Sequence, residues 1–318
     1  MPFTICFDIG GTRIKSGVIA GDKIVQTNLS EVKDNSALQP ILVKLERVID
    51  QYLAEHKQTD QLAGIGIALP CFVDSKKNKI LSHYVKYTDA AGLDLNQWAR
   101  NKWGVPIALQ NDAKAALLGE AEYGAGKGYR NLVMLTFGTG IGSGVMLDGH
   151  LLNGKDYIAG NLAGHSIIDY DGDLCNCGNI GCTEAVASSW SLPHKVQKMW
   201  AAEDQQELAS VELTSFENID FKYLFDQAAK GHQFYNKVLE DCLQAWGMAL
   251  VNMVLAYNPD CIICGGGIMK SHEIIFPYFK KVLDQHGWIN SEFVELKKAE
   301  QPEYAALLGM NYTITKPI

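Results

Sequence analysis

Three cysteines and one histidine lie close together in the chain and could bind a metal ion. The stretch reads GHSIIDYDGDLCNCGNIGC, and its candidate ligands are His165, Cys175, Cys177 and Cys182. Thiolates and a neutral imidazole in a set of four are what tetrahedral Zn²⁺ requires. The alternative is three free thiols beside a surface histidine. The loop is glycine-rich and polar, with little to fold around except a metal. Four protein ligands close the coordination sphere, so the sequence predicts a structural zinc without an open catalytic position.

Three glycine-rich turns each follow an apolar run that is typical of a β-strand. We name them the first (residues 10–12), second (138–142) and third (265–267) glycine turns. Their candidate anion-binding residues are Gly10, Gly11, Thr12, Gly138, Thr139, Gly140, Gly265, Gly266 and Gly267. Glycine lets backbone N–H groups converge on an anion without a side chain in the way. A single glycine pair is usually only a hairpin turn. Three at strand ends, two with an adjacent threonine, indicate a nucleotide held between two domains.

Asp8 and Lys15 flank the first glycine turn in the stretch CFDIGGTRIKSGVI. A carboxylate beside a triphosphate can hold Mg²⁺, directly or through water. Lys15 would supply positive charge near the phosphates, and a solvated strand lysine is an equally good interpretation. Other nucleotide motifs do not fit the chain. GAGKG at 124–128 ends in glycine and is no P-loop, and no G-x-G-x-x-G opens a helix near the N-terminus.

The sequence QND, at residues 110–112, interrupts an apolar strand pattern just before an alanine-rich helix. Ligand sites in α/β proteins usually lie outside the carboxyl ends of strands. Phosphoryl transfer needs a base within hydrogen-bond reach of the acceptor hydroxyl. Asp112 could be that base while Asn111 holds a neighbouring hydroxyl. Taken alone, Asp112 is better explained as the N-cap of the helix. Beside three glycine turns, the catalytic interpretation is favoured.

The elements that must position these residues alternate between strands and helices, which favours an α/β fold. A helix is predicted over ALQPILVKLERVIDQYLAEH and a strand over LAGIGIALP, followed by a polar, turn-rich segment to about Asn101. The strand–glycine turn–strand pattern of the N-terminus recurs at NLVMLTFGTGIGSGVMLDG and indicates an internal duplication. Helices are expected from about Ser188 to Asn258, then the strand CIICGGGIM and a terminal helix in PEYAALLGMNY.

Composition excludes several classes of protein. Hydrophobic content of 47% with 20% charged residues is typical of a globular chain long enough, at 318 residues, for two domains. A net charge of −8 argues against a nucleic-acid groove. No signal peptide or membrane span is recognisable, so we expect a cytosolic protein without a membrane partner. In a reducing compartment cysteines are thiols or metal ligands; those expected in the core are Cys6, Cys242, Cys261 and Cys264.

Together these motifs resemble the ROK family (repressors, open reading frames and sugar kinases) of the actin-like ATPase superfamily. The resemblance covers the whole chain. It rests on D-x-G-G-T-x-x-K from Asp8 to Lys15, N-D at Asn111, F-G-T-G-I-G-x-G at 137–144 and G-H…C-x-C-G-x-x-G-C-x-E from Gly164 to Glu184. NPDCIICGGGI is similar to the family's adenosine-side loop, and AALLG to its last helix.

The resemblance implies a two-domain actin-like ATPase (ribonuclease H-like) fold with a cleft and a structural zinc loop at 164–184. The expected domains are 1–112 with the terminal helix, about 302–318, and 113–301. The implied activity is ATP-dependent phosphorylation of a hexose, commonly at the 6-hydroxyl, by a cytoplasmic homodimer that uses Mg²⁺. By the same resemblance Asp112 is the base, and Asn111, His165 and Glu184 contact the sugar.

The chain departs from the family pattern on the sugar side. Leu162, in NLAGH, occupies the position of a glutamate that binds sugar hydroxyls near the anomeric carbon. Cys71, in PCFVD, replaces a glycine, and the segment 82–95 lacks the N-x-P-G-W pattern. The phosphate side is intact, so kinase chemistry is better supported than glucose specificity. A loop shifted by one residue, with Asn161 replacing the glutamate, is the alternative explanation.

Two other function classes compete with the kinase. A sugar-responsive repressor would need a helix-turn-helix segment, for which the residues before Asp8 leave no room. A sugar-binding sensor without catalysis fits the same fold, but the presence of both Asp8 and Asp112 argues against it.

Overall fold

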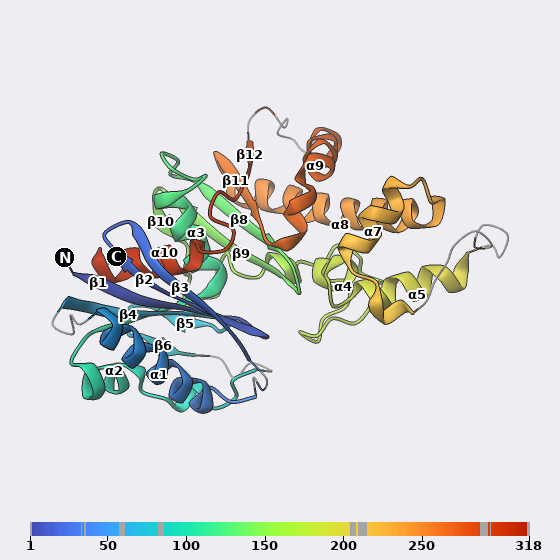
Figure 1. The fold of residues 1–318 in the computed structure, drawn as a ribbon. Coiled ribbons are helices and arrows are strands. Elements are labelled where there is room, and N and C mark those ends of the chain that lie inside the picture. Colours follow the sequence, from blue (N-terminus) through green and yellow to red (C-terminus); the bar gives the residue numbers. More distant parts are fainter. Residues whose placement is uncertain are drawn as a thin grey trace. The chain divides into compact units, whose positions relative to one another are not determined.

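The computed structural model describes residues 2–32, 34, 36–56, 61–81, 86–203, 208, 215–286, 292 and 294–316. By contacts the chain divides into two compact units. The first contains residues 1–129, 151–159 and 299–318, and the second contains residues 130–150 and 160–298. Each unit is an α/β structure with a five-stranded sheet (Figure 1).

The sheet of the first unit has the order β3-β2-β1-β4-β7. β1 pairs antiparallel with β2 and parallel with β4, and β4 pairs parallel with β7. The elements of this unit are β1 (Phe3–Ile9), β2 (Arg13–Ala20), β3 (Lys23–Glu31), α1 (Gln39–His56), β4 (Leu62–Leu69), β5 (Val73–Asp74), β6 (Lys79–Ile80), η2 (Ala90–Gly92), α2 (Leu95–Trp103), β7 (Ile107–Asn111), α3 (Asp112–Tyr123) and α10 (Ala305–Thr315).

Helices cover both faces of this sheet (Figure 1). On one face α1 and α2 pack in a core with Ile5, Phe7 and Ile67. On the other face α10 and α3 pack with Cys6 and Ala68. α3 and α10 cross closely, because a Cβ on Gly119 would meet the carbonyl oxygen of Ala305 at 1.9 Å. Helix α3 therefore belongs to the first unit, whereas the domain boundary predicted from the sequence lies before this helix, at residue 112.

The second sheet has the order β10-β9-β8-β11-β12. β8 pairs antiparallel with β9 and parallel with β11, which pairs parallel with β12. The elements are β8 (Leu132–Phe137), β9 (Ile141–Leu147), β10 (His150–Leu151), η3 (Ala163–His165), α4 (Thr183–Ala187), α5 (Leu192–Ala202), η4 (Phe216–Asn218), α7 (Phe221–Ala229), α8 (Gln233–Tyr257), β11 (Cys261–Gly265), η5 (Gly267–Ser271), α9 (His272–His286) and β12 (Glu295–Lys298). Strand order and direction thus repeat those of the first sheet, as expected from the two glycine hairpins.

The core of the second unit forms where α8 and α9 pack on β8. Phe137 of β8 contacts Trp246 and Phe279, with ring centroids 5.6 and 6.1 Å apart. Of the described helices α8 alone is long and apolar enough to cross a membrane, and 67% of its most apolar window is buried, as in a core helix.

One predicted irregular segment contains regular structure. The sequence up to about Asn101 was expected to be turn-rich, but helix α2 lies there. Its N-cap Asp94 accepts a hydrogen bond from the backbone N–H of Gln97, and Gly104 ends the helix with a φ of 70°. The four residues 82–85 of the unusual segment 82–95 lie outside the described part of the chain.

Candidate functional site

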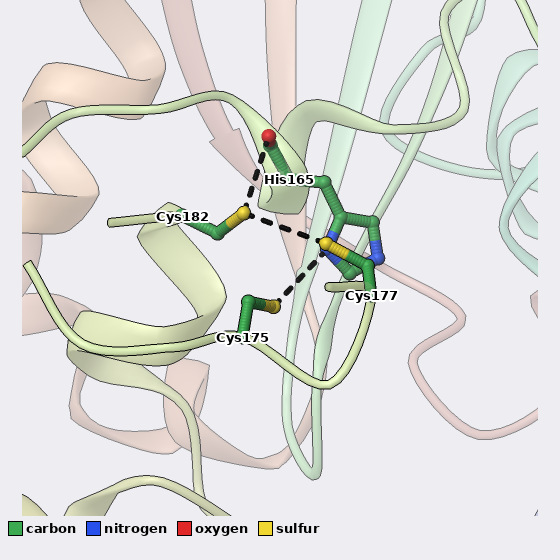
Figure 2. Close-up of side chains that lie close together, drawn as sticks. All are labelled: His165, Cys175, Cys177 and Cys182. Atoms are coloured by element: carbon green, nitrogen blue, oxygen red, sulfur yellow. Dashed lines mark hydrogen bonds between the residues drawn. The ribbon is translucent and has the colours of Figure 1, made fainter. Parts of the chain in front are cut away.

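The four predicted metal ligands converge in the second unit (Figure 2). The ligand atoms of His165, Cys175, Cys177 and Cys182 all lie within 4.8 Å of one another. The sulfurs of Cys177 and Cys182 are 3.6 Å apart, and Cys175 Sγ is 3.6 Å from Nδ1 of His165. Bonds of about 2.3 Å from zinc to sulfur and about 2.0–2.1 Å to nitrogen separate tetrahedral ligands by about 3.5–3.8 Å. The cluster therefore has the size and the donor set that a tetrahedral zinc ion needs.

Short backbone contacts close the metal loop around its ligands. Isolated β-bridges join Ile167 with Cys182 and Leu174 with Ile180. Gly181, with a φ of 69°, leaves room for the carbonyl oxygen of Asp169, which a Cβ would meet at 1.4 Å. Burial, with the neighbouring thiols, raises the pKa of Cys182. Because burial opposes a charge on Cys182, the charge of a metal is what would stabilise this side chain as a thiolate.

The cysteines expected in the core are buried there. Cys6, Cys242, Cys261 and Cys264 are all 0% exposed. Burial raises the pKa of Cys6, of Cys242 and of Cys261 to about 12. These thiols are therefore inert at neutral pH.

The first glycine turn connects β1 and β2 and places two charged side chains opposite each other. Asp8 pairs with Lys15 across the strands, and Lys15 Nζ lies 3.9 Å from the Asp8 carboxylate. Lys15 Nζ also donates a hydrogen bond to the carbonyl oxygen of Glu303 at 2.9 Å. Burial raises the pKa of Asp8 to about 6; Lys15 lowers it and Asp112 raises it further. A cation beside Asp8 would stabilise its ionised form.

Asn111 and Asp112 lie at the same end of the parallel strands as Asp8, the carboxyl end. β1, β4 and β7 are parallel, and Leu69 of β4 pairs with Asn111. Two strand spacings of about 4.8 Å therefore separate the ends of β1 and β7 by roughly 10 Å. Asn111 is the N-cap of α3, and Oδ1 of Asp112 accepts a hydrogen bond from the backbone N–H of Ala113 at 2.8 Å. Burial raises the pKa of Asp112.

The second and third glycine turns lie side by side in the other unit, at the ends of the parallel strands β8 and β11. Gly265 pairs with Thr136, and a Cβ on Gly266, whose φ is 90°, would meet the carbonyl oxygen of Phe137 at 2.2 Å. A Cβ on Gly138 would meet nothing within 4 Å, and its φ is not positive. Neither backbone conformation nor packing among the described residues explains that glycine.

The sugar-side residues predicted in the second unit lie next to the metal loop. His165 supplies Nδ1 to the cluster, and Leu162 is 37% exposed. Asn161 is buried, and its Oδ1 has no hydrogen-bond partner among the described residues. Glu184 accepts hydrogen bonds from the backbone N–H of Ile141 at 2.7 Å and from Trp190 Nε1 at 3.1 Å. An acceptor without a partner thus lies one residue before the position where the sequence lacks a glutamate.

Sequence reasoning missed two side chains of the first unit. The hydroxyl of Tyr87, buried and with a φ of 55°, donates to the carbonyl oxygen of Gly10 at 2.9 Å. Lys114 is 1% exposed and donates to Asn153 Oδ1 and to the carbonyl oxygen of Tyr157. Burial lowers the pKa of Lys114 to about 8. The sequence signal for Lys114 was a lysine among the apolar residues of the helix predicted after QND. Tyr87 lies in a stretch without a recognisable pattern.

This chain is similar in sequence to proteins of one known family. Residues 4–316 match the profile of the ROK family. A glucokinase of Thermotoga maritima is 32% identical over 309 residues, 95% of this chain and 94% of that one. The xylose repressor of Bacillus spizizenii is 30% identical over 218 residues, 67% of this chain and 50% of the repressor.

A solved structure extends the same likeness to the fold. The ROK family glucokinase from Streptomyces griseus, in complex with glucose and AMPPNP, matches with a TM-score of 0.77 and 25% identity over 97% of this chain and 98% of that chain. The fold is the two-domain actin-like ATPase fold, with mixed sheets and helices in each unit. The family profile and the Thermotoga relative both span nearly the whole sequence, and this chain belongs to the ROK family.

Proposed function

We propose that this chain is an ATP-dependent sugar kinase that phosphorylates a hexose or hexose derivative at its 6-hydroxyl. The glucokinase relatives support the reaction class. Within the chain, the arrangement around Asp112 is the observation that carries the proposal. This carboxylate lies at the carboxyl end of β7, where α/β proteins usually bind ligands, and burial raises its pKa.

Asp112 is proposed as the general base. A raised pKa makes the carboxylate a stronger proton acceptor. The sugar hydroxyl would give its proton to Asp112 as its oxygen bonds to the γ-phosphorus of ATP, and the bond to the ADP oxygen would break. Asn111, fixed by its capping hydrogen bonds, would hold a neighbouring sugar hydroxyl.

The glycine turns are proposed as the nucleotide side. The first would approach the phosphates with Thr12 and Lys15, and the second with Gly138, Thr139 and Gly140. The third, residues 265–267, would lie against the nucleoside. Asp8 would hold Mg²⁺, whose charge neutralises phosphate oxygens during transfer. The burial that raises the pKa of Asp8 supports this role, because a carboxylate in such a position lacks a full counter-charge.

Zinc is proposed to act only on structure. His165, Cys175, Cys177 and Cys182 would hold it, and their four bonds would leave no position for substrate. His165 presents Nδ1 to the cluster, so the rest of its imidazole ring stays available to a sugar. The metal would then fix the orientation of a sugar-binding histidine.

Turnover of ATP with a panel of hexoses tests the proposal. The wild-type chain should release ADP in equal amounts with a sugar phosphate, whose phosphorylated carbon is read by NMR. Release of ADP without sugar phosphate, or no release with any hexose, would contradict the proposal.

The likeness to a xylose repressor favours a second candidate, a sugar-binding sensor without phosphoryl transfer. If the wild-type protein binds sugar by calorimetry but turns over no ATP, it acts as a sugar sensor and not as a kinase.

A further inference from the structure

We propose that Glu184 is a positioning residue that fixes the second glycine turn and couples it mechanically to the metal loop. The resemblance assigns Glu184 only to the sugar. The inference deepens the proposed function, because it assumes that this turn binds the phosphates of a nucleotide.

Both oxygens of the Glu184 carboxylate are engaged next to the turn. Oε2 accepts a hydrogen bond from the backbone N–H of Ile141 at 2.7 Å, and Oε1 accepts one from Trp190 Nε1 at 3.1 Å. Hydrogen bonds from N–H donors to a carboxylate are among the stronger ones in proteins. The carboxylate therefore holds the residue at which the turn enters β9.

Gly140 shows that the turn is fitted to this carboxylate. A Cβ on Gly140 would lie 2.5 Å from Glu184 Oε2, and its φ is not positive. A Cβ at this position would displace the Glu184 carboxylate, so the approach of Glu184, and not the backbone conformation, accounts for the glycine. Gly138 differs, since open space surrounds its Cβ position. The two glycines of this turn thus have different roles. Gly140 makes room for the Glu184 carboxylate, and Gly138 leaves one face of the turn open to a ligand.

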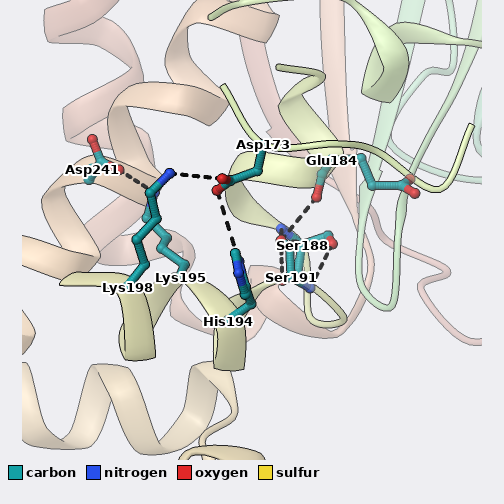
Figure 3. Close-up of polar contacts among 8 residues, drawn as sticks. All are labelled: Asp173, Glu184, Ser188, Ser191, His194, Lys195, Lys198 and Asp241. Carbon is teal, nitrogen blue, oxygen red and sulfur yellow. Dashed lines mark hydrogen bonds and ion pairs between the residues drawn. The ribbon is translucent and has the colours of Figure 1, made fainter. Parts of the chain in front are cut away.

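The backbone after α4 holds the opposite side of the turn. The N–H of Ser189 donates to the carbonyl oxygen of Gly138 at 3.0 Å, and that of Trp190 to Thr139 at 3.3 Å. Ser191 in turn donates to the carbonyl oxygen of Glu184 at 3.0 Å, as Figure 3 shows. The segment 184–191 therefore contacts the turn through the Glu184 side chain and through two backbone groups.

The metal loop determines where this segment begins. Cys182 is the N-cap of α4, and Glu184 lies in the first turn of that helix. Cys182 Sγ lies 3.4 Å from the carbonyl oxygen of His165, and the N–H of Thr183 donates to Ser166 at 3.0 Å. Two metal ligands thus fix the start of the helix that carries Glu184. Loss of the metal should loosen the second glycine turn even though no ligand belongs to it.

Amide hydrogen exchange of the peptide 137–144 tests the inference without any substrate. In the zinc-loaded protein, Glu184→Gln should speed exchange at Ile141 about tenfold or more, because a neutral amide oxygen accepts a weaker hydrogen bond than a carboxylate and the NH₂ group cannot accept one from the second N–H donor. Glu217→Gln, an exposed glutamate of the same unit, is the matched control and should change nothing. Chelation should speed exchange in the wild type and add little in Glu184→Gln. Unchanged exchange in Glu184→Gln would overturn the inference.

Binding measurements add a readout that a merely structural role would not move. The dissociation constant of a non-hydrolysable ATP analogue should rise about tenfold in Glu184→Gln, with zinc content and Tm close to wild type. Gly140→Ala, which pushes a methyl group against the same oxygen, should do likewise, and the double variant should be no worse than either single variant. A change in sugar affinity alone would assign Glu184 to the sugar and refute the positioning role.

These outcomes separate the inference from the proposed function. If the wild-type protein binds no ATP analogue, the proposed function fails, while the exchange experiment still decides whether Glu184 holds the turn. If the wild type binds the analogue and Glu184→Gln binds it equally well, only the inference fails.

Discussion

Asn111 Oδ1 accepts a hydrogen bond from the backbone N–H of Ala113 at 2.9 Å, and a second from Lys114 at 3.2 Å. Asn111, not Asp112, is therefore the N-cap of α3. The sequence left open whether Asp112 served as a cap or as a catalytic base. Because its neighbour makes the capping bonds, Asp112 can be changed without removing the cap, and its catalytic and structural contributions can be measured separately.

Asp112→Asn should lower kcat by two or more orders of magnitude, the scale of lost general-base catalysis. Affinity for an ATP analogue should survive, because the substitution removes a proton acceptor and little volume. Stopped-assay turnover and calorimetric binding measure the two effects. Near-normal turnover would show that Asp112 takes no proton.

Asn111→Ala is the structural counterpart. Removing an N-cap side chain should lower the free energy of unfolding by about 1 kcal/mol, with a range of about 0.5–2 kcal/mol. Asp112→Asn should cost clearly less. Urea denaturation of both variants gives the comparison, and equal losses would contradict the division of roles.

Asp8→Asn should stabilise the protein at pH 8 while abolishing activity. A buried carboxyl whose folded pKa is about 6, against an ordinary 3.8, favours the protonated form in the folded state. The folded protein then binds more protons than the unfolded chain between about pH 4 and 6, so stability falls as the pH rises through that window. Above it the penalty is fully present, roughly 2–3 kcal/mol at about 1.4 kcal/mol per pKa unit.

The pH dependence of this variant distinguishes the cause. The gain in unfolding free energy of Asp8→Asn should be largest above pH 7 and should be mostly lost near pH 4, where Asp8 is protonated in the folded state and about half protonated in the unfolded chain. Urea titrations at pH 4, 6 and 8 measure it. A gain independent of pH would mean that the effect comes from packing and not from the buried charge.

Purified protein should contain about one zinc per chain by elemental analysis. Cys177→Ser should lose the metal, because a hydroxyl is a poor replacement for a thiolate ligand. Cys177 is the exposed ligand, so the loss of packing is small. Cys261→Ala, which changes a core cysteine of β11, should lower stability but keep the zinc. Full sugar affinity in metal-free wild type would contradict a role for zinc in the sugar site.

Motif order and strand patterns predicted the grouping of the candidate metal ligands and the duplication of the α/β unit. The metal ligands were readable because four such residues in one polar loop have few other uses, and the structure confirms that they converge. The repeated glycine hairpin likewise predicted an internal duplication, and the structure contains two five-stranded sheets of corresponding strand order. Both predictions depend on residues that are close in sequence.

Contacts between distant segments could not be read in the same way. Tyr87 reaches the carbonyl oxygen of Gly10, 77 residues away, from a segment without periodicity. The family resemblance implied a sugar contact for Glu184, but its hydrogen bond with Ile141 joins residues 43 positions apart and leaves no local pattern. Helix α2 was missed because its nine residues, LNQWARNKW, are mostly polar. Side-chain pairings of this kind depend on tertiary packing, which local pattern does not encode.

Two hydrogen bonds of Ser143 hold the loop that carries Asn161 and Leu162. The buried hydroxyl of Ser143 donates to the carbonyl oxygen of Gly160 at 2.9 Å and accepts from the N–H of Ala163 at 3.0 Å. Leu162 cannot accept a hydrogen bond, and it is partly exposed. Asn161 Oδ1 is a buried acceptor without a partner among the described residues. Such an atom costs about 1–3 kcal/mol, which a donating sugar hydroxyl would recover.

Asn161→Ala should therefore move stability and affinity in opposite directions. Removing an unsatisfied acceptor should leave the free energy of unfolding equal or higher, whereas sugar affinity should fall about ten- to a hundredfold, the equivalent of about 1–3 kcal/mol. We expect glucose to be a poor substrate of the wild type. Leu162→Glu should raise kcat/KM for glucose relative to its C2 epimer, N-acetylated hexosamines and a β-glucoside. Calorimetry, urea denaturation and kcat/KM across these four sugar types measure the three effects. Asn161→Ala exchanges an acceptor for a methyl group, and Leu162→Glu exchanges a leucine for a carboxylate, so a sugar hydroxyl that contacts either residue should bind differently. If glucose is already the best wild-type substrate by a wide margin, and neither substitution changes the order of the sugars, then Asn161 and Leu162 do not select the substrate.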